Sequence, residues 1–284
     1  MVFQMNKLIE DYTEEALRSK SSTTVRTYQY ELKQFEAWLF AAGTDLYSYA
    51  RADVQQYIDS LMFAEKSAST VNKAFHALKS FSKWLGKEEA VEDIRVVKPV
   101  DYKKSAPKSL DRLDTLRLIR QADRSENARD YAIIMILLHT GIRVGELVAL
   151  NRSDVVISER KGRLIIREGK GNKSREVPLN PETRRAIVKS LEERLDDNRA
   201  LFISNRNSRI TARTVQRIVK KYGGDHPHRL RHTFITALIR SGEDFSLAMA
   251  LSGHSSADMI MRYSQPSEEE KQRAVDKLYL TRGS

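Results

Sequence analysis

Residues 226–263 are HPHRLRHTFITALIRSGEDFSLAMALSGHSSADMIMRY, and this stretch gathers most of the side chains that suggest chemistry. In a helix, His228 and Arg231 are three residues apart, so an imidazole and a guanidinium point the same way one turn apart. A turn then carries a second imidazole at His254, and a short amphipathic run leads to Tyr263. An imidazole, a guanidinium and a phenol together indicate chemistry on a phosphodiester.

The positive charge of the chain lies in its second half. The chain has 284 residues, enough for about two domains, and a formal net charge of +11. Residues 1–100 hold 13 Lys and Arg against 14 Asp and Glu, which leaves 36 and 24 for the remainder. A basic domain favours a polyanion, and the absence of a long apolar run favours nucleic acid over a membrane.

The chain has no cysteine, which excludes disulfides, thiol catalysis and thiolate metal sites. The N-terminal stretch MVFQMNKLIEDYTEEALRSK places acidic residues where a signal peptide needs an apolar core. We therefore expect a cytoplasmic protein.

Residues 1–97 are predicted to form an all-helical domain. Apolar residues recur at helical spacing in four segments separated by polar breaks: 5–17, 24–40, 52–62 and 69–85. Polar patches at 23–26 and 69–79 fall at helix starts, where backbone N–H groups can meet phosphates. We name Arg26, Lys73 and Lys79 as candidate DNA contacts, although N-capping and a solvated face explain the same residues.

Residues 98–108 are predicted to be a linker, because prolines and charges replace the periodic pattern there. A hinge at this place would let two domains close around duplex DNA.

Residues 109–264 are predicted to form a mixed α/β domain, followed by a tail at 265–284. Helices are expected at 110–122, 126–140, 143–150, 181–195 and 211–222, and an amphipathic tail helix at 268–280. The run 132–138, AIIMILL, is apolar on every side and should be buried. Three short alternating segments, 155–157, 164–167 and 174–178, predict a small sheet, with a hairpin turn at 169–172. The fold class is mainly α with a small β-sheet.

Arg143 follows the glycine that ends the most apolar helix. A lone arginine is most often a surface charge, but a guanidinium at the edge of an apolar core needs an anion. Glu146, one turn on, is a candidate partner that orients Arg143 or a neighbouring histidine.

Lys170 occupies the Gly-Lys-Gly tip of the predicted hairpin. Turns often carry lysine for solubility, yet a tip that places an ammonium in a groove is suited to donate a proton to a leaving alkoxide. We interpret Lys173 and Arg175 as phosphate contacts or exposed strand ends.

A single histidine such as His228 is more often a packed or capping residue than a catalyst. Because Arg231 lies one turn away, we favour a catalytic role for His228. His254 could cap a helix or hydrogen-bond a phosphoryl oxygen. His232 lies in an apolar context, and we interpret it as structural.

Over nearly the whole chain, the sequence resembles the tyrosine recombinase (phage integrase) family in the order and spacing of its motifs. These motifs are TGIRVGELVAL, GKGNKSREVPL, HRLRHTFIT and SGHSS, followed by Tyr263. The helical first domain resembles that family's core-binding (SAM-like) domain, and the compact size is similar to Xer-type recombinases of the archaeal branch. Ser252 departs from the pattern, because the family often has an aliphatic residue there; we expect an effect on packing alone.

The resemblance implies that Tyr263 is the nucleophile and that Arg143 and Arg231 clamp the scissile phosphate. It implies Lys170 as general acid, and His228 and His254 as proton-transfer and hydrogen-bonding partners. The chain would then be a site-specific recombinase that cuts and rejoins DNA through a 3′-phosphotyrosyl link. It would act as a homo-tetramer on two target sites with exchange of C-terminal helices, although the tail helix could equally fold onto its own domain. Its task would be the resolution of chromosome dimers or the integration of a mobile element.

This chemistry requires no metal and no cofactor. The phosphotyrosine ester retains the energy of the broken bond, two arginines can stabilise the pentavalent state, and no paired-carboxylate cluster suited to two Mg²⁺ ions accompanies these motifs. Two alternatives remain open at this point. One is a type IB topoisomerase-like enzyme that relaxes DNA, and the other is a DNA-binding regulator on an inactive recombinase scaffold.

Overall fold

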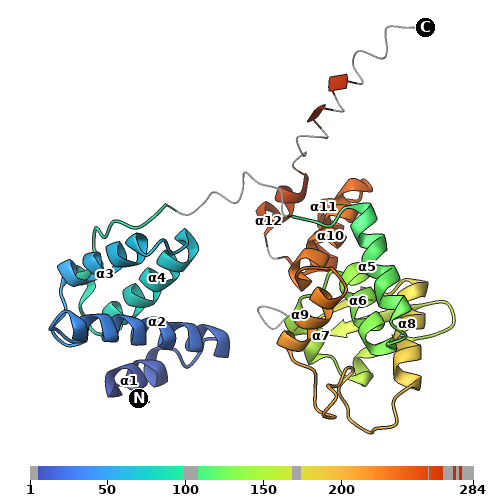
Figure 1. The fold of residues 1–284 in the computed structure, drawn as a ribbon, viewed down its shortest axis with the longest axis horizontal. Helices are drawn as coiled ribbons and strands as arrows, with labels where there is room; N and C mark the ends of the chain where they lie inside the picture. The colour runs from blue at the N-terminus through green and yellow to red at the C-terminus, as the bar shows by residue number, and fades with distance from the viewer. Residues whose placement is uncertain are drawn as a thin grey trace. The chain divides into compact units, whose positions relative to one another are not determined.

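The computed structural model describes residues 6–98, 108–167, 174–254, 256–264, 271, 272, 275 and 276. The chain divides into two compact units, Met1–Asp101 and Tyr102–Ser284 (Figure 1). No helix among the described residues is long and apolar enough to cross a membrane.

Unit 1 is helical throughout its described part. Its elements are α1 (Lys7–Ala16), α2 (Ser22–Ala41), α3 (Arg51–Phe63), α4 (Ala68–Trp84) and the short 3₁₀ helix η1 (Glu88–Val91). The apolar faces meet in one core in which Tyr12, Leu32, Phe35 and Phe81 are fully buried or nearly so. Burial of these large side chains stabilises helices that would be marginal in isolation.

Serine caps set where two of these helices begin. The Ser21 hydroxyl accepts the Thr24 N–H at 3.1 Å, and the Ser67 hydroxyl accepts the Thr70 N–H at 3.2 Å. An N-cap side chain replaces a hydrogen bond that the first helical turn lacks, so each helix starts directly after its serine. The predicted starts at 24 and 69 were therefore slightly late.

Unit 2 is built around a buried helix. Its α-helices are α5 (Arg112–Arg124), α6 (Ala128–Thr140), α7 (Val144–Ala149), α8 (Pro181–Glu192), α9 (Ala212–Lys221), α10 (Pro227–Arg240), α11 (Phe245–Ser252) and α12 (Ala257–Met261). The stretch 132–138 of α6 is buried along its whole length, as its sequence predicts. Helices α5, α8 and α10 pack around α6, which gives unit 2 its main core.

A small antiparallel sheet lies beside these helices. Its strands are β1 (Val155–Ile157), β2 (Gly162–Ile166) and β3 (Arg175–Pro178), in the order β1-β2-β3. Leu164 pairs with Val155 on one side and Val177 on the other, and Leu164 and Val177 face the core. The predicted fold class, mainly α with a small β-sheet, is confirmed. The predicted hairpin turn at 169–172 lies outside the described residues, as do most of the linker and of the tail helix.

Candidate active site

The turn between α6 and α7 places Arg143. Helix α6 ends at Thr140, and Gly141 follows with a left-handed φ of 60°. A Cβ at Gly141 would lie 2.3 Å from Cδ1 of Phe234, so both the conformation and the packing require glycine. Arg143 is then the N-cap residue of α7, and its side chain is 31% exposed at the edge of the core.

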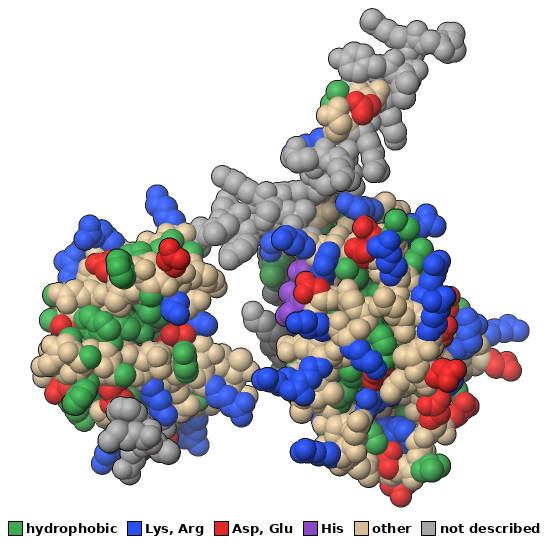
Figure 2. All heavy atoms as spheres, in the orientation of Figure 1, with side chains coloured by type: hydrophobic (Ala, Val, Ile, Leu, Met, Phe, Trp, Pro, Cys, Tyr) green, Lys and Arg blue, Asp and Glu red, His purple; other side chains and the backbone are tan. Residues whose placement is uncertain are grey.

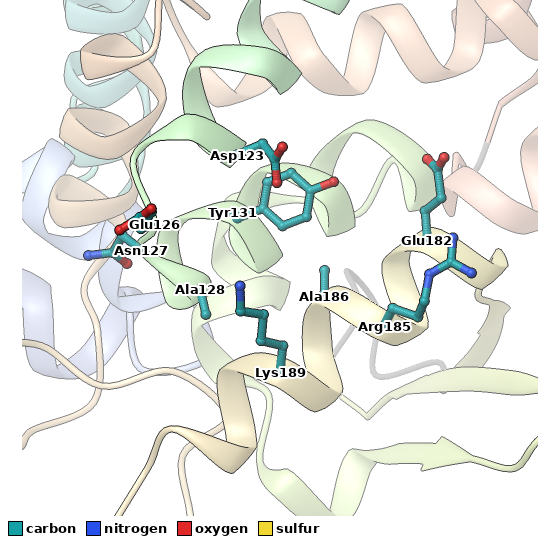
Figure 3. A pocket seen from close by; sticks show the side chains of 9 residues that line it. All are labelled: Asp123, Glu126, Asn127, Ala128, Tyr131, Glu182, Arg185, Ala186 and Lys189. Carbon is teal, nitrogen blue, oxygen red and sulfur yellow. The ribbon is translucent and has the colours of Figure 1, made fainter.

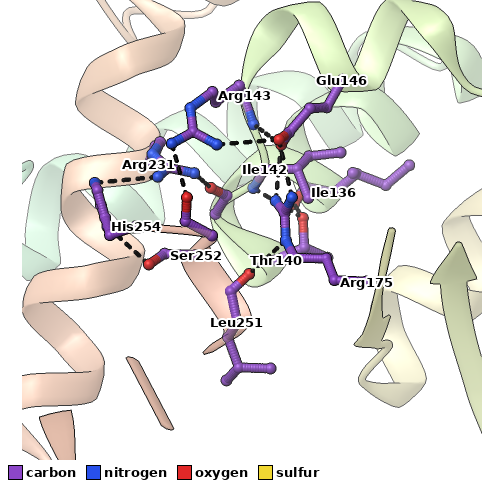
Figure 4. A network of polar contacts seen from close by, with 12 residues as sticks. Ile136, Thr140, Ile142, Arg143, Glu146, Arg175, Arg231, Leu251, Ser252 and His254 are labelled. Carbon is purple, nitrogen blue, oxygen red and sulfur yellow. Dashed lines mark hydrogen bonds and ion pairs between the residues drawn. The ribbon is translucent and has the colours of Figure 1, made fainter. Parts of the chain in front are cut away.

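Glu146 is a buried carboxylate held by two arginines (Figure 4). Its side chain is 5% exposed and accepts the backbone N–H of Arg143 at 2.7 Å and the Arg143 Nη1 at 3.1 Å. Arg175 approaches the same carboxylate with both Nη atoms, at 2.9 and 2.8 Å. Burial alone raises the pKa of Glu146, but the hydrogen bonds and charges of Arg175 and Arg143 outweigh it, so the pKa lies below its usual value.

Arg175 was predicted to be either a phosphate contact or an exposed strand end, and the second alternative is wrong. Its side chain is 14% exposed, because the guanidinium turns inward to Glu146 and donates from Nε to the Leu251 carbonyl at 3.3 Å. The guanidinium also packs against Gly253, where a Cβ would lie 2.9 Å from its Cζ atom. Arg175 therefore links β3 to the turn after α11.

Arg231 is a buried cation on α10. It is 1% exposed and donates from Nη1 to the carbonyl of Gly141, which caps the end of α6, and from Nη2 to Nε2 of His254 at 3.2 Å. Both of these partners are neutral. Burial, followed by the neighbouring charge of Arg143, lowers the pKa of Arg231 to about 10, so the guanidinium stays charged at neutral pH. A buried charge in this setting favours an anion nearby.

Arg143 and Arg231, the two arginines predicted to be catalytic, both hydrogen-bond to the turn at 252–254. Arg143 donates from Nη2 to the Gly253 carbonyl at 2.9 Å, while Arg231 contacts His254. Gly253 ends α11 with a left-handed φ of 67°. Two guanidinium groups from α7 and α10 thus converge on one turn.

Ser252 fixes the tautomer of His254. The Ser252 hydroxyl donates to the Ala248 carbonyl at 2.5 Å, so it is left to accept from Nδ1–H of His254 at 2.8 Å. Nε2 of His254 then accepts from Arg231. Burial, followed by the charges of Arg231 and Arg143, lowers the pKa of His254 to about 3, which agrees with a neutral ring. We expected Ser252 to affect packing alone, and that expectation is wrong, because Ser252 hydrogen-bonds a candidate active-site residue.

Tyr263 lies in the short 3₁₀ helix η4 (Arg262–Ser264) directly after α12 and is 6% exposed. Its ring centroid lies 6.3 Å from that of His254. Burial raises the pKa of the Tyr263 phenol, and the charges of Arg231 and Arg262 oppose that rise. The phenol is therefore protonated at neutral pH and must lose its proton before it can attack.

Sequence reasoning missed the direct partner of Tyr263. Nδ1 of His232 lies 2.6 Å from the Tyr263 hydroxyl oxygen, although the apolar flanks of His232 suggested a structural residue. The ring of His228, one turn earlier on α10, lies 4.6 Å from the ring of His232. The repeat of histidine at i and i+4, which aligns both on one helix face, was a signal that could have drawn attention to His232.

The other predicted site residues divide into two groups. Lys170 and Lys173 lie outside the described residues. In unit 1, Arg26 and Lys79 are exposed, and Lys73 is half exposed with its Nζ 3.6 Å from a Glu31 oxygen. These three side chains are accessible to a partner.

A basic helix face in unit 2 was not singled out from the sequence. Arg213, Arg217 and Lys220 lie on one face of α9, and all three are exposed. Helix α9 contains no acidic residue, and a short turn joins it to α10, at whose start His226 and His228 are exposed. Figure 2 shows histidine side chains at the surface of unit 2 with lysine and arginine around them.

A separate polar pocket of about 200 Å³ lies between α8 and the α5–α6 connection (Figure 3). Both acidic and basic side chains line it, including Asp123, Glu182, Arg185 and Lys189. It contains none of the predicted catalytic residues. Within the described ranges, no group of three or more His, Asp and Glu side chains is arranged to hold a metal ion.

Comparisons with known proteins match both units. Residues 108–270 match the family described as Phage integrase family, and residues 9–89 match Phage integrase, N-terminal SAM-like domain. The tyrosine recombinase XerA of Pyrococcus horikoshii is 32% identical over 93% of this chain and 90% of its own length. The tyrosine recombinase XerC of Corynebacterium glutamicum is 30% identical over 97% of this chain and 92% of its own length.

Solved structures show the same fold. A crystal structure of XerA recombinase matches with a TM-score of 0.53 and 26% identity over 99% of this chain and 100% of that one. A XerH site-specific recombinase bound to palindromic difH substrate in a post-cleavage complex matches with a TM-score of 0.73 and 22% identity, over 97% and 84% of the two chains.

Proposed function

Since the chain belongs to the phage integrase family of tyrosine recombinases and is a Xer-type site-specific DNA recombinase, we propose that Tyr263 is its nucleophile. The observation that carries this proposal is the convergence of Arg143 and Arg231 on the turn at 252–254, where the ring of His254 lies beside the buried ring of Tyr263. The relatives do not favour a relaxing topoisomerase or a DNA-binding regulator.

In the proposed reaction the Tyr263 oxygen attacks phosphorus and the 5′-oxygen of the broken strand leaves. Arg143 and Arg231 hold the non-bridging oxygens and stabilise the added charge, because guanidinium groups bind phosphate in a forked geometry. The Arg143 side chain is 31% exposed, whereas Arg231 is 1% exposed and must become accessible before it can bind the phosphate. His228 and His254 are proposed hydrogen-bonding and proton-transfer partners, and Lys170 is the proposed acid for the 5′-oxygen.

A direct test of this function uses a nicked duplex that traps the covalent complex. The duplex is selected from a random pool by binding to the wild-type protein and is then nicked next to the cleavage position, so that the short leaving strand is lost. We expect a denaturant-resistant adduct whose digest contains a peptide with DNA attached at Tyr263. An adduct at any other residue, or no adduct, contradicts the assignment.

We propose that α9 and the exposed cations of unit 1, Arg26, Lys73 and Lys79, contact DNA phosphates. The exposed face of α9 carries Arg213, Arg217 and Lys220 and no acidic residue, and each phosphate contact releases bound counterions. Replacing Arg213 and Arg217 together by Gln should weaken binding to every duplex. It should also reduce the slope of log affinity against log salt by about 0.9 per lost contact.

Fluorescence anisotropy across a salt series measures that slope. Lys189→Gln, which removes an exposed cation from α8, is the matched control and should leave the slope unchanged. An unchanged slope in the double variant would show that α9 does not contact phosphates.

We propose that the protein assembles as a homo-tetramer on two target sites, with its C-terminal helix packed on a neighbouring subunit, and that it serves chromosome dimer resolution. A chain ending at Ser264 should bind a single site as tightly as the full chain, but should form no four-subunit complex and no recombinant product. Mass photometry on paired sites, together with a product assay, tests this expectation. Recombinant product at the full-length rate would exclude the exchange of tails.

A further inference from the structure

We propose that His232 is a catalytic residue that accepts the proton of the Tyr263 hydroxyl as its oxygen attacks phosphorus. This inference rests on the proposed function of Tyr263 and extends it, because a phenol protonated at neutral pH needs a base within reach. Among the described side chains, His232 is the one hydrogen-bonded to that hydroxyl, with Nδ1 2.6 Å from the oxygen.

The geometry favours His232 over the other histidines. His254 has no hydrogen bond to the Tyr263 hydroxyl in the described structure; its Nδ1–H donates to Ser252 and its Nε2 accepts from Arg231. His228 has its ring against that of His232 and has no hydrogen bond to Tyr263 in the described structure. Among the residues that the structure describes, His232 alone combines an available lone pair with direct contact to the reacting oxygen.

The surroundings of His232 keep its ring neutral. It is partly buried, and the groups that face it are His228, Arg231 and His226 from its own helix and Arg262 and Tyr263 from η4. Burial, followed by the charges of His228, Arg231, Arg262 and His226, lowers the pKa of His232 to about 4. At neutral pH its Nδ1 is therefore available as an acceptor for the phenolic proton.

The step balances without a further reactant. The Tyr263 oxygen forms a bond to phosphorus while its proton moves to Nδ1 of His232, and the bond from phosphorus to the 5′-oxygen breaks. The 5′-oxygen takes a proton from the general acid on its own side, for which Lys170 is proposed. In the rejoining step the same proton returns from His232 to the tyrosine oxygen.

Single-turnover cleavage by His232 variants tests this role. We expect His232→Ala to slow formation of the covalent adduct by about 100-fold, within the range of general base catalysis, with duplex binding retained. His232→Asn places an oxygen near the position of Nδ1 that accepts the hydrogen bond but cannot take the proton, so we expect it to be slow as well. If the His232→Ala variant does not fold, the His232→Asn variant provides the same test.

A substrate with sulfur in place of the bridging 5′-oxygen separates the base from the acid. A thiolate leaves without being protonated, so this substrate should restore a variant that lacks the general acid, such as Lys170→Ala, and should not restore either His232 variant. Ser241→Ala is the control, because it removes an exposed hydroxyl directly after the C-terminal end of the same helix, where the hydroxyl hydrogen-bonds only to the Leu238 carbonyl in the described structure. It should cleave at the wild-type rate.

Three results would overturn the role of His232. These are wild-type or faster cleavage by His232→Ala, a wild-type rate for His232→Asn, and restoration of His232→Ala by the sulfur substrate. The second result would leave His232 as a residue that only positions the hydroxyl. Failure of the wild-type protein to form any adduct would instead overturn the proposed function itself.

Discussion

Tyr263→Phe should abolish the covalent protein–DNA complex while the protein still folds and binds its duplex. The substitution removes only the hydroxyl that would attack phosphorus. When a covalent nucleophile is removed, the loss of rate is on the order of 10⁶-fold, so no adduct should be detectable. The ring remains in its buried position, and the lost hydrogen bond to His232 costs about 1 kcal/mol of stability.

The measurement combines a denaturing gel with equilibrium binding on the same nicked duplex. Tyr47→Phe is the matched control, because it makes the same chemical change at a tyrosine that is 59% exposed, and it should form adduct normally. An adduct that persists in Tyr263→Phe would place the nucleophile on another residue. Loss of both binding and adduct would instead indicate damage to the fold.

Glu146→Gln should cause the largest loss of stability among single substitutions in the site. The carboxylate is buried between Arg143 and Arg175, and neutralising it leaves two cations without their charge partner and turns an amide N–H₂ toward one of them. Breaking a buried pair by removing one partner costs about 3–5 kcal/mol. In a domain the size of unit 2 that corresponds to a fall in Tm of about 10 °C.

Differential scanning calorimetry measures this change, and the tryptophans identify which unit unfolds. The two tryptophans of the chain, Trp38 and Trp84, are both in unit 1, so their fluorescence transition should stay at the wild-type temperature. Glu176→Gln is the control, because it neutralises a carboxylate that is 61% exposed and paired with Arg163. Exposed pairs contribute about 0–1 kcal/mol, so its Tm should scarcely change.

The effect of Glu146→Gln should also depend on pH in a defined direction. Because the pKa of Glu146 is lowered in the folded protein, the carboxylate stabilises the fold fully above its unfolded pKa of about 4.3. That contribution is lost as the pH falls through the lower folded pKa, where the wild-type side chain also loses its charge. The difference in unfolding free energy between the two proteins should therefore be largest near neutral pH and shrink in acid. A difference that grows in acid would contradict a stabilising charge on Glu146.

Much of the fold could be predicted because its signals are local. The apolar run in α6, the alternating residues of β1 and β2, and the serines before α2 and α4 act within a few positions of one another. Helix periodicity and capping depend on neighbours three or four residues away, which a single sequence shows directly. The same reasoning brought Arg143, Arg231, His254 and Tyr263 into one proposed site, aided by the order of the motifs that carry them.

Sequence alone determined the helical and strand segments, the residue types available for phosphate chemistry, and the family to which they belong. Tertiary structure alone decided how individual groups are paired. Arg175 turns inward to a carboxylate 29 positions away, and His232 meets a hydroxyl 31 positions away, although its neighbours in the chain are apolar. Such pairings depend on how separate helices and strands pack, and the energy of a hydrogen bond depends on distance and burial in space, which spacing along a chain does not specify.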